Sequence, residues 1–163
     1  MPFYHRLGIV PDKRHTVSRQ PNGQLYQEEL VGTQGFAGLS SLVYHLYPPT
    51  RVRQKGKPYS VKPKIAAENS LNAMSFNGFD VAPEKDFLKS RKTLFVNSAM
   101  HIGVAAPSTS TDYFFKNADA DEMWFVHKGS GTLHTMYGSL HFAYGDYLII
   151  PRGTVYQITF NTT

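Results

Sequence analysis

The sequence contains no cysteine and no long hydrophobic run. The absence of cysteine excludes disulfide frameworks, thiolate metal sites, iron–sulfur clusters and cysteine nucleophiles. No window approaches the roughly 18 consecutive apolar residues of a membrane span, and residues 1–14 have no apolar core of a signal peptide. We therefore expect a cytoplasmic protein that does not contact a membrane.

Charge is scarce and unevenly distributed. Only 18% of the 163 residues are charged, whereas 13% are aromatic, which is typical of one ordered domain. Residues 1–92 hold 14 Lys and Arg against 7 Asp and Glu, a balance of +7, and residues 93–163 hold 3 against 5, a balance of −2. The two balances sum to the net charge of +5.

A basic segment lies between Glu29 and Glu68, where no acidic residue occurs. Its cations are Arg51, Arg53, Lys55, Lys57, Lys62 and Lys64. Four prolines between residues 48 and 63 interrupt any helix that would enter a nucleic-acid groove, and no recognised nucleic-acid-binding module surrounds the segment. We expect no nucleic-acid partner, and an acidic protein surface is the favoured contact.

Short segments with β character, separated by turns that contain glycine, dominate the second half of the chain. This pattern is typical of an antiparallel barrel or jelly roll. We expect strands over residues 93–97, 100–106, 113–116, 122–127, 131–137, 139–144, 147–150 and 154–160. We expect residues 1–92 to form an arm and an extended, proline-rich region packing on a barrel of residues 93–163. Within this region, residues 1–35 are polar and irregular, and the pattern predicts a short strand over 39–47 and a short helix over 83–90.

Turn residues in the last fifty positions match the skeleton of a cupin barrel. The first cupin motif runs Gly-x5-His-x-His-x3,4-Glu-x6-Gly, and the second runs Gly-x5-Pro-x-Gly-x2-His. Here six residues separate Glu122 from Gly129, and five separate Gly145 from Pro151, which is followed at the right spacing by Gly153. The predicted fold is mostly β: a cupin-like jelly-roll barrel preceded by an irregular N-terminal arm with short strands.

In metal-binding cupins, the three motif histidines and the glutamate hold one ion. Of these four positions only Glu122 keeps a ligand here, because Phe115, Asn117 and Tyr156 replace the histidines. The shorter spacing of the first motif would place Lys116 and Ala118 at the first two positions. One carboxylate beside an aromatic ring and an amide binds a transition metal poorly. We therefore expect no metal in this barrel.

Other candidate residues form no recognised catalytic pattern. His127, His134 and His141 recur every seven residues, and we interpret them as surface or hydrogen-bonded strand residues. The remaining histidines, which stand alone or in the arm, are His5, His15, His45 and His101. The carboxylates of residues 119–122 lack the ligand spacing of an EF-hand and read as a polar turn entering a strand.

Short segments along the whole chain carry a family resemblance. They are residues 1–5 (MPFYH), 13–16 (KRHT), 19–23 (RQPNG), 30–41 (LVGTQGFAGLSS), 44–46 (YHL), 48–50 (PPT), 92–95 (KTLF), 101–103 (HIG), 117–122 (NADADE), 125–127 (FVH), 129–131 (GSG) and 144–157 (YGDYLIIPRGTVYQ). Through them the chain resembles the N-terminal portion of a bacterial branch of homogentisate 1,2-dioxygenase.

The resemblance implies an Fe(II)-dependent, ring-cleaving dioxygenase of tyrosine and phenylalanine catabolism. The family converts homogentisate and O2 to maleylacetoacetate, has a bicupin-like β fold and forms homo-oligomers, commonly hexamers. Its iron ligands, two histidines and a glutamate, lie in a C-terminal half beyond Thr163. The resemblance therefore implies an apparently truncated first barrel that has no catalytic residue, binds no Fe(II) and is inactive alone. Which residues bind substrate is not indicated.

Two alternatives remain open from the residues alone. One is a stand-alone, metal-free cupin that acts as a small-molecule-binding or assembly module. The other is a metal-free cupin isomerase or epimerase with an aromatic pocket. The residues of that pocket would be Trp124, His127, Tyr137, Tyr144 and Tyr156.

Overall fold

The structure is a computed structural model that describes residues 18–66 and 73–161. The chain divides into two compact units, Met1–Lys57 and Pro58–Thr163. Two of the candidate histidines, His5 and His15, lie outside the described residues, as do the first two segments of the family resemblance.

The first unit contains an antiparallel hairpin of β1 (Gln27–Gln34) and β2 (Ala37–His45). The turn between them uses Gly35 at φ 62°, in the left-handed region that glycine favours. The strand predicted over residues 39–47 is confirmed as β2. Residues 1–35 were expected to be irregular, so β1 was not foreseen. Its sequence QEELVGTQ has too few apolar residues to show the alternation of a strand.

The second unit carries one short helix and eight strands among its described residues. They are α1 (Phe87–Ser90), β3 (Lys92–Val96), β4 (His101–Val104), β5 (Phe115–Lys116), β6 (Glu122–Phe125), β7 (Gly131–Thr135), β8 (Gly138–Phe142), β9 (Tyr147–Ile150) and β10 (Val155–Phe160). All eight predicted strands are confirmed, and α1 covers the second half of the predicted helix. The mostly β fold is therefore confirmed.

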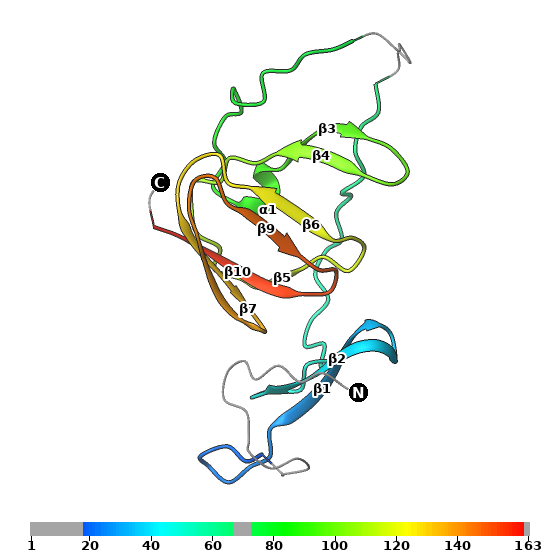
Figure 1. Ribbon diagram of the computed structural model, residues 1–163, viewed down its shortest axis with the longest axis vertical. Coiled ribbons are helices and arrows are strands. Elements are labelled where there is room, and N and C mark those ends of the chain that lie inside the picture. The colour runs from blue at the N-terminus through cyan, green and yellow to red at the C-terminus, as the bar shows by residue number, and fades with distance from the viewer. Residues whose placement is uncertain (1–17, 67–72, 162–163) are drawn as a thin grey trace. The chain divides into compact units, whose positions relative to one another are not determined.

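The strands of the second unit pair into three antiparallel sheets (Figure 1). The largest sheet has the order β5-β10-β7-β8, and the other two are the pairs β3-β4 and β6-β9. Alternation places one face of each strand inward, as in β9, where Leu148 and Ile150 are buried while Tyr147 and Ile149 are exposed.

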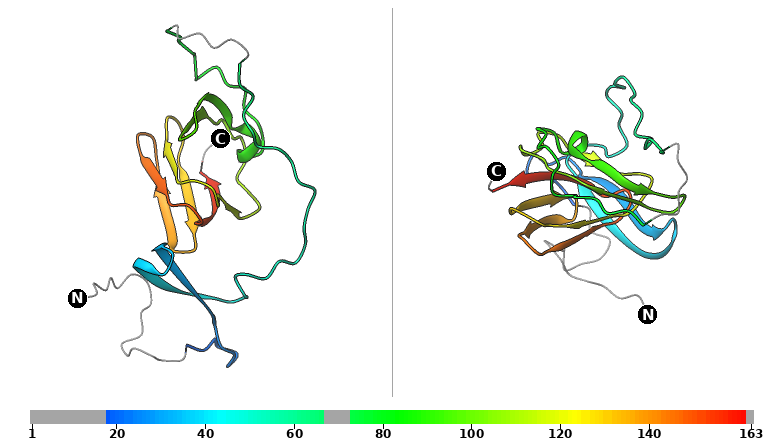
Figure 2. Two further views of the ribbon diagram at one scale, coloured as in Figure 1. Left: turned by 90° about the vertical axis from the view of Figure 1, so that its right-hand side faces the viewer. Right: turned by 90° about the horizontal axis from the view of Figure 1, so that it is seen from above.

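One apolar core joins the largest sheet, the β6-β9 pair and α1. Its buried members are Phe87, Leu133, Phe142, Leu148, Ile150, Tyr156 and Ile158. Because β9 and β10 both supply residues to this cluster, β6-β9 packs on the larger sheet as a second layer, which the two views of Figure 2 make visible. This is sheet-on-sheet packing, with α1 adding Phe87 to the same core.

No sheet closes into a barrel within the described ranges, so the expected cupin jelly-roll barrel is not confirmed. β6 and β9 are only four residues long, and among the strands that the structure describes each has only the other as its backbone-paired neighbour. Apolar packing, rather than a continuous hydrogen-bond ladder, therefore joins the layers. No helix in the described part of the chain has the length and apolar character to cross a membrane.

Candidate functional site

The residues at the four positions predicted from the cupin motifs come together in the second unit. Phe115 lies on β5, Asn117 directly follows it, Glu122 begins β6 and Tyr156 lies on β10. The Asn117 Nδ2 donates to Glu122 Oε1 over 3.0 Å, and the Tyr156 hydroxyl donates to Glu122 Oε2 over 2.7 Å. Strand pairing and sheet packing thus direct two polar groups, an amide and a phenol, to one carboxylate.

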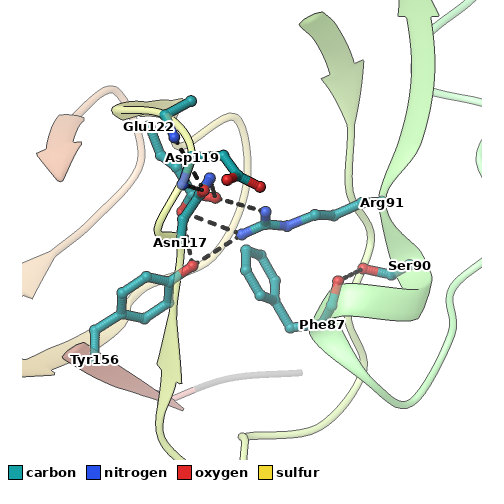
Figure 3. Close-up of polar contacts among 8 residues, drawn as sticks. Phe87, Ser90, Arg91, Asn117, Asp119, Glu122 and Tyr156 are labelled. Carbon is teal, nitrogen blue, oxygen red and sulfur yellow. Dashed lines mark hydrogen bonds and ion pairs between the residues drawn. The ribbon is translucent and has the colours of Figure 1, made fainter. Parts of the chain in front are cut away.

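The centre of this cluster is Arg91, which follows the last residue of α1 (Figure 3). Its Nη1 donates to Glu122 Oε1 over 2.7 Å, and its Nη2 lies 3.3 Å from Glu122 Oε2. The same Nη2 donates to the Tyr156 hydroxyl oxygen over 2.9 Å. The guanidinium therefore binds two of the four positions directly and in a forked geometry that suits a carboxylate.

Aromatic rings surround the Arg91 guanidinium on its other sides. Its carbon lies 4.4 Å from the ring centroid of Phe87, 5.6 Å from that of Phe115 and 5.9 Å from that of Trp124. All three distances fall within cation–π range, although only Phe87 is close. The Tyr156 ring packs edge-on against Phe115 and Trp124, with centroids 5.5 and 5.3 Å away. Phe115, at the first motif position, therefore also lies near the guanidinium.

The degree of burial of the cluster's side chains affects their pKa values. The side chain of Glu122 is 9% exposed and that of Arg91 is 32% exposed. Burial alone would raise the pKa of Glu122, but the hydrogen bonds from Arg91 and Tyr156 outweigh it and hold the pKa below its ordinary value. Burial also raises the pKa of Tyr156, and its hydrogen bond to Glu122 adds to that rise. The cluster is therefore an ionised carboxylate, a guanidinium and a neutral phenol.

Local hydrogen bonds explain why Asn117 presents its amide to Glu122. The Asn117 Oδ1 accepts the backbone N–H of Asp119 over 3.0 Å, which turns the chain into β6. The backbone N–H of Arg152 donates to Asp121 Oδ1 over 2.7 Å, and that of Gly153 donates to the Asn117 carbonyl over 2.7 Å. The second motif loop is thereby fastened to the turn that precedes β6, so residues 119–122 form the expected polar turn.

The helix that carries Arg91 is held in place by a cap and by its core residue. The side chain of Asp86 accepts from the backbone N–H of Lys89 over 2.9 Å, and the hydroxyl of Tyr113 donates to the other oxygen of Asp86 over 2.6 Å. The Phe87 ring packs on Trp124 with centroids 4.9 Å apart. Because α1 has only four residues, these tertiary contacts, not its own hydrogen bonds, position Arg91.

The donor set of this cluster does not fit Fe(II). It offers one carboxylate, one amide and one phenol, without an imidazole, and both carboxylate oxygens already accept hydrogen bonds from Arg91. Among the residues that the structure describes, no group of three His, Asp or Glu is arranged to hold a metal ion. Instead, the Arg91 guanidinium hydrogen-bonds Glu122 and Tyr156 and lies 5.6 Å from the ring centroid of Phe115.

The histidines singled out in the sequence are not brought together. His101 is exposed on β4. The other four have separate partners. The His127 ring stacks on Phe79 with centroids 4.1 Å apart, and the His45 ring bonds Glu29 over 2.7 Å. The His134 ring bonds the hydroxyls of Ser139 and Thr159, and the His141 ring bonds the Thr132 hydroxyl over 3.0 Å. No two of these four histidines share a partner in these contacts.

The aromatic residues of the alternative isomerase pocket are also divided between core and surface. Tyr156 and Trp124 pack together in the core, whereas the side chains of Tyr137 and Tyr144 are more than half exposed. Sequence reasoning missed Arg91, which belongs to this cluster although it precedes the first predicted barrel strand. The available signal was that a carboxylate expected inside a barrel needs a cationic partner, and Arg91 directly follows the helix predicted over residues 83–90.

Two comparisons with known proteins found matches. The family model described as "Homogentisate 1,2-dioxygenase N-terminal" matches residues 7–163. A protein of Saccharolobus solfataricus named "Putative dioxygenase SSO1533" is 37% identical over 163 residues, which cover 98% of this chain and 42% of that protein. The chain thus spans about two fifths of the length of this relative. No solved structure matches the chain.

Proposed function

The chain belongs to the homogentisate 1,2-dioxygenase N-terminal family, and from this premise we propose that it is the non-catalytic N-terminal part of a ring-cleaving dioxygenase. The whole enzyme would open the ring of homogentisate with O2 to give maleylacetoacetate in tyrosine and phenylalanine breakdown. Fe(II) would supply the positions at which substrate and O2 meet. In this proposal the enzyme is cytoplasmic and homo-oligomeric, and the second unit is the first of two cupin-like modules.

The observation that carries this proposal is that Arg91 binds Glu122, the one carboxylate among the four motif positions. A ring-cleaving iron site needs neutral imidazoles, a carboxylate and open coordination positions. Here Glu122 accepts hydrogen bonds from Arg91, Tyr156 and Asn117, and none of the four positions holds an imidazole. These four positions therefore do not suit Fe(II), and we propose that the iron is held by a part of the longer protein outside this chain.

An exposed apolar sheet face supports a role within a larger protein. Met123 and Phe125 of β6 and Tyr147 and Ile149 of β9 point away from the core, and each is more than half exposed. The strand register pairs Met123 with Ile149 and Phe125 with Tyr147, so the four side chains form one continuous patch. Because the Saccharolobus relative is more than twice as long as the matched region, we propose that the remainder of the longer protein covers this patch.

The basic segment supports a second contact of the same kind. Residues 51–64 have no helix or strand, and all six of their Lys and Arg side chains belong to residues that are exposed or half-buried. We propose that the segment packs on an acidic surface of the remainder of the protein or of a neighbouring subunit. Reversing the charges of Arg51, Arg53, Lys55 and Lys57 would then weaken oligomerisation of the full-length protein. Unchanged oligomerisation would argue against this contact.

The proposed division of labour is tested by assaying the chain alone. The purified chain is loaded anaerobically with Fe(II), mixed with homogentisate and exposed to O2, while the ultraviolet absorption of the ring-opened product is followed. A full-length homogentisate 1,2-dioxygenase serves as the positive control. We expect no turnover and no stoichiometric iron by metal analysis. Turnover by the chain alone, or one bound iron per chain, would overturn the proposal.

A further inference from the structure

We propose that Glu122, Asn117 and Tyr156 form an organic-cation site whose resident ligand is the guanidinium of Arg91. The site would bind a free alkylguanidinium ion once this side chain is shortened. A guanidinium would thus stand where metal-binding cupins hold their ion. The inference concerns the second unit alone, and it does not depend on the substrate or activity of the parent enzyme.

The acceptors of the site match a planar cation. Two nitrogens of Arg91 face the two oxygens of Glu122 at 2.7 and 3.3 Å, and one of them also donates to the hydroxyl oxygen of Tyr156 at 2.9 Å. A compact metal ion needs several donors converging on one point, whereas these acceptors are spread along one edge of a planar fork. The geometry therefore selects a guanidinium over a metal ion.

Hydrogen bonds between the site residues orient the Glu122 carboxylate without the Arg91 side chain. Tyr156 donates to one oxygen of Glu122 and Asn117 donates to the other, so the carboxylate remains oriented when Arg91 is removed. The phenol is buried and its ring is fixed between Phe115 and Trp124. The acceptors are thus pre-organised, which lowers the ordering cost of binding a free ion.

The walls of the site favour an organic cation over a hydrated inorganic one. The Phe87 ring lies 4.4 Å from the guanidinium carbon, and Phe115 and Trp124 lie within 6 Å on other sides. Aromatic faces attract weakly hydrated cations, and a guanidinium sheds its water more readily than a small metal ion. The chemical class of ligand is therefore an alkylguanidinium.

The ligand is supplied by a different segment from its acceptors. Arg91 lies 31 residues before Glu122 and 65 residues before Tyr156, at the junction of α1 and β3. Occupation of the site therefore also fastens this junction to the two-layer sheet. A metal ion would satisfy the carboxylate without making that connection.

The test removes the resident cation and returns it as a free ion. In Arg91→Ala the missing atoms correspond to ethylguanidinium, which is titrated at millimolar concentrations far below those that denature proteins. The single tryptophan, Trp124, lies 5.9 Å from the guanidinium carbon, so its fluorescence reports occupation directly. The melting temperature gives a second readout. Urea, a neutral planar analogue, and sodium chloride are the ligand controls, and Arg53→Ala, which removes an exposed arginine, is the matched variant.

We expect a saturable fluorescence change and a rise in melting temperature for Arg91→Ala with ethylguanidinium, and neither effect with urea or sodium chloride. Wild type and Arg53→Ala should not respond. Adding Glu122→Gln should weaken the apparent affinity by about tenfold or more, because the charge-assisted hydrogen bonds are lost. If Arg91→Ala does not fold alone, folding in ethylguanidinium but not in urea supports the site. An equal response of all variants, or no response of Arg91→Ala, overturns it.

Discussion

Replacing Glu122 by glutamine is the sharpest test of the Arg91 cluster, because the two side chains have the same shape. The substitution keeps the volume and removes the charge that faces Arg91 at 2.7 Å. It also replaces one of the two oxygens, which both accept hydrogen bonds, by an amide NH2 group that cannot accept one from Arg91, Tyr156 or Asn117. The expected result is a less stable second unit with an unchanged fold.

The magnitude follows from the burial of the two partners. Breaking a fully buried ion pair costs about 3–5 kcal/mol, but Arg91 is one-third exposed and water screens part of the loss. We therefore expect Glu122→Gln to lower the free energy of unfolding by about 2–4 kcal/mol. At about 4 °C per kcal/mol, the melting temperature of this unit falls by roughly 8–16 °C. Urea denaturation followed by circular dichroism measures the first quantity, and calorimetry measures the second.

A double-mutant cycle separates the ion pair from other effects of the substitution. Arg91→Met keeps an apolar stem beside Phe87 and removes the charge, so the double variant should be more stable than the sum of the single losses predicts, by about 1–3 kcal/mol. The matched control is Glu84→Gln, which breaks the exposed ion pair with Lys92 and should cost at most about 1 kcal/mol. A cost for Glu122→Gln as small as that of Glu84→Gln would refute the reasoning.

Three further predictions concern the surroundings of the cluster. The pKa of Glu122 is held below its ordinary value of 4.5, so its contribution to stability is present above pH 4.5 and is lost as the pH falls through the folded-state pKa. We therefore expect a plot of unfolding free energy against pH to have a shallower slope below about pH 5 in Glu122→Gln than in the wild type. Phe87→Ala should cost about 3–5 kcal/mol in urea denaturation, because it empties a buried site against Trp124 and undocks α1. Gly131→Ala should lower the melting temperature clearly, because the added Cβ would lie 2.2 Å from the Thr159 carbonyl oxygen and 2.7 Å from the Phe142 ring. The control Gly56→Ala adds its Cβ in open space and should leave the melting temperature unchanged.

The strands of the second unit were predictable because their signals are local. Residues 147–150 were predicted as a strand and observed as one, since Gly145 and Pro151 delimit a short apolar segment, YLII. The strand β1 was missed because its polar sequence QEELVGTQ has no such apolar segment. Its pairing with β2, in a register that places Leu30 opposite Leu42, makes it a strand.

The candidate site was predictable only in part. Motif spacing alone identified Phe115, Asn117, Glu122 and Tyr156 as related positions, and the structure brings them together. Motif spacing did not identify Arg91, because its contact with Glu122, 31 residues later in the chain, depends on how α1 docks and not on any nearby residue. Nor did spacing reveal that the two layers are joined by packing instead of by a closed ladder of hydrogen bonds.

By itself, the sequence determined the family, the mostly β character, the turns of the second unit and the absence of histidine from the four motif positions. These properties depend on residue types and short spacings, which act within a few residues of the chain. The tertiary structure alone decided which cation faces those positions. Phe87 enters the core between the sheets, and this docking carries Arg91 to the buried carboxylate of Glu122, whose charge requires a cation there.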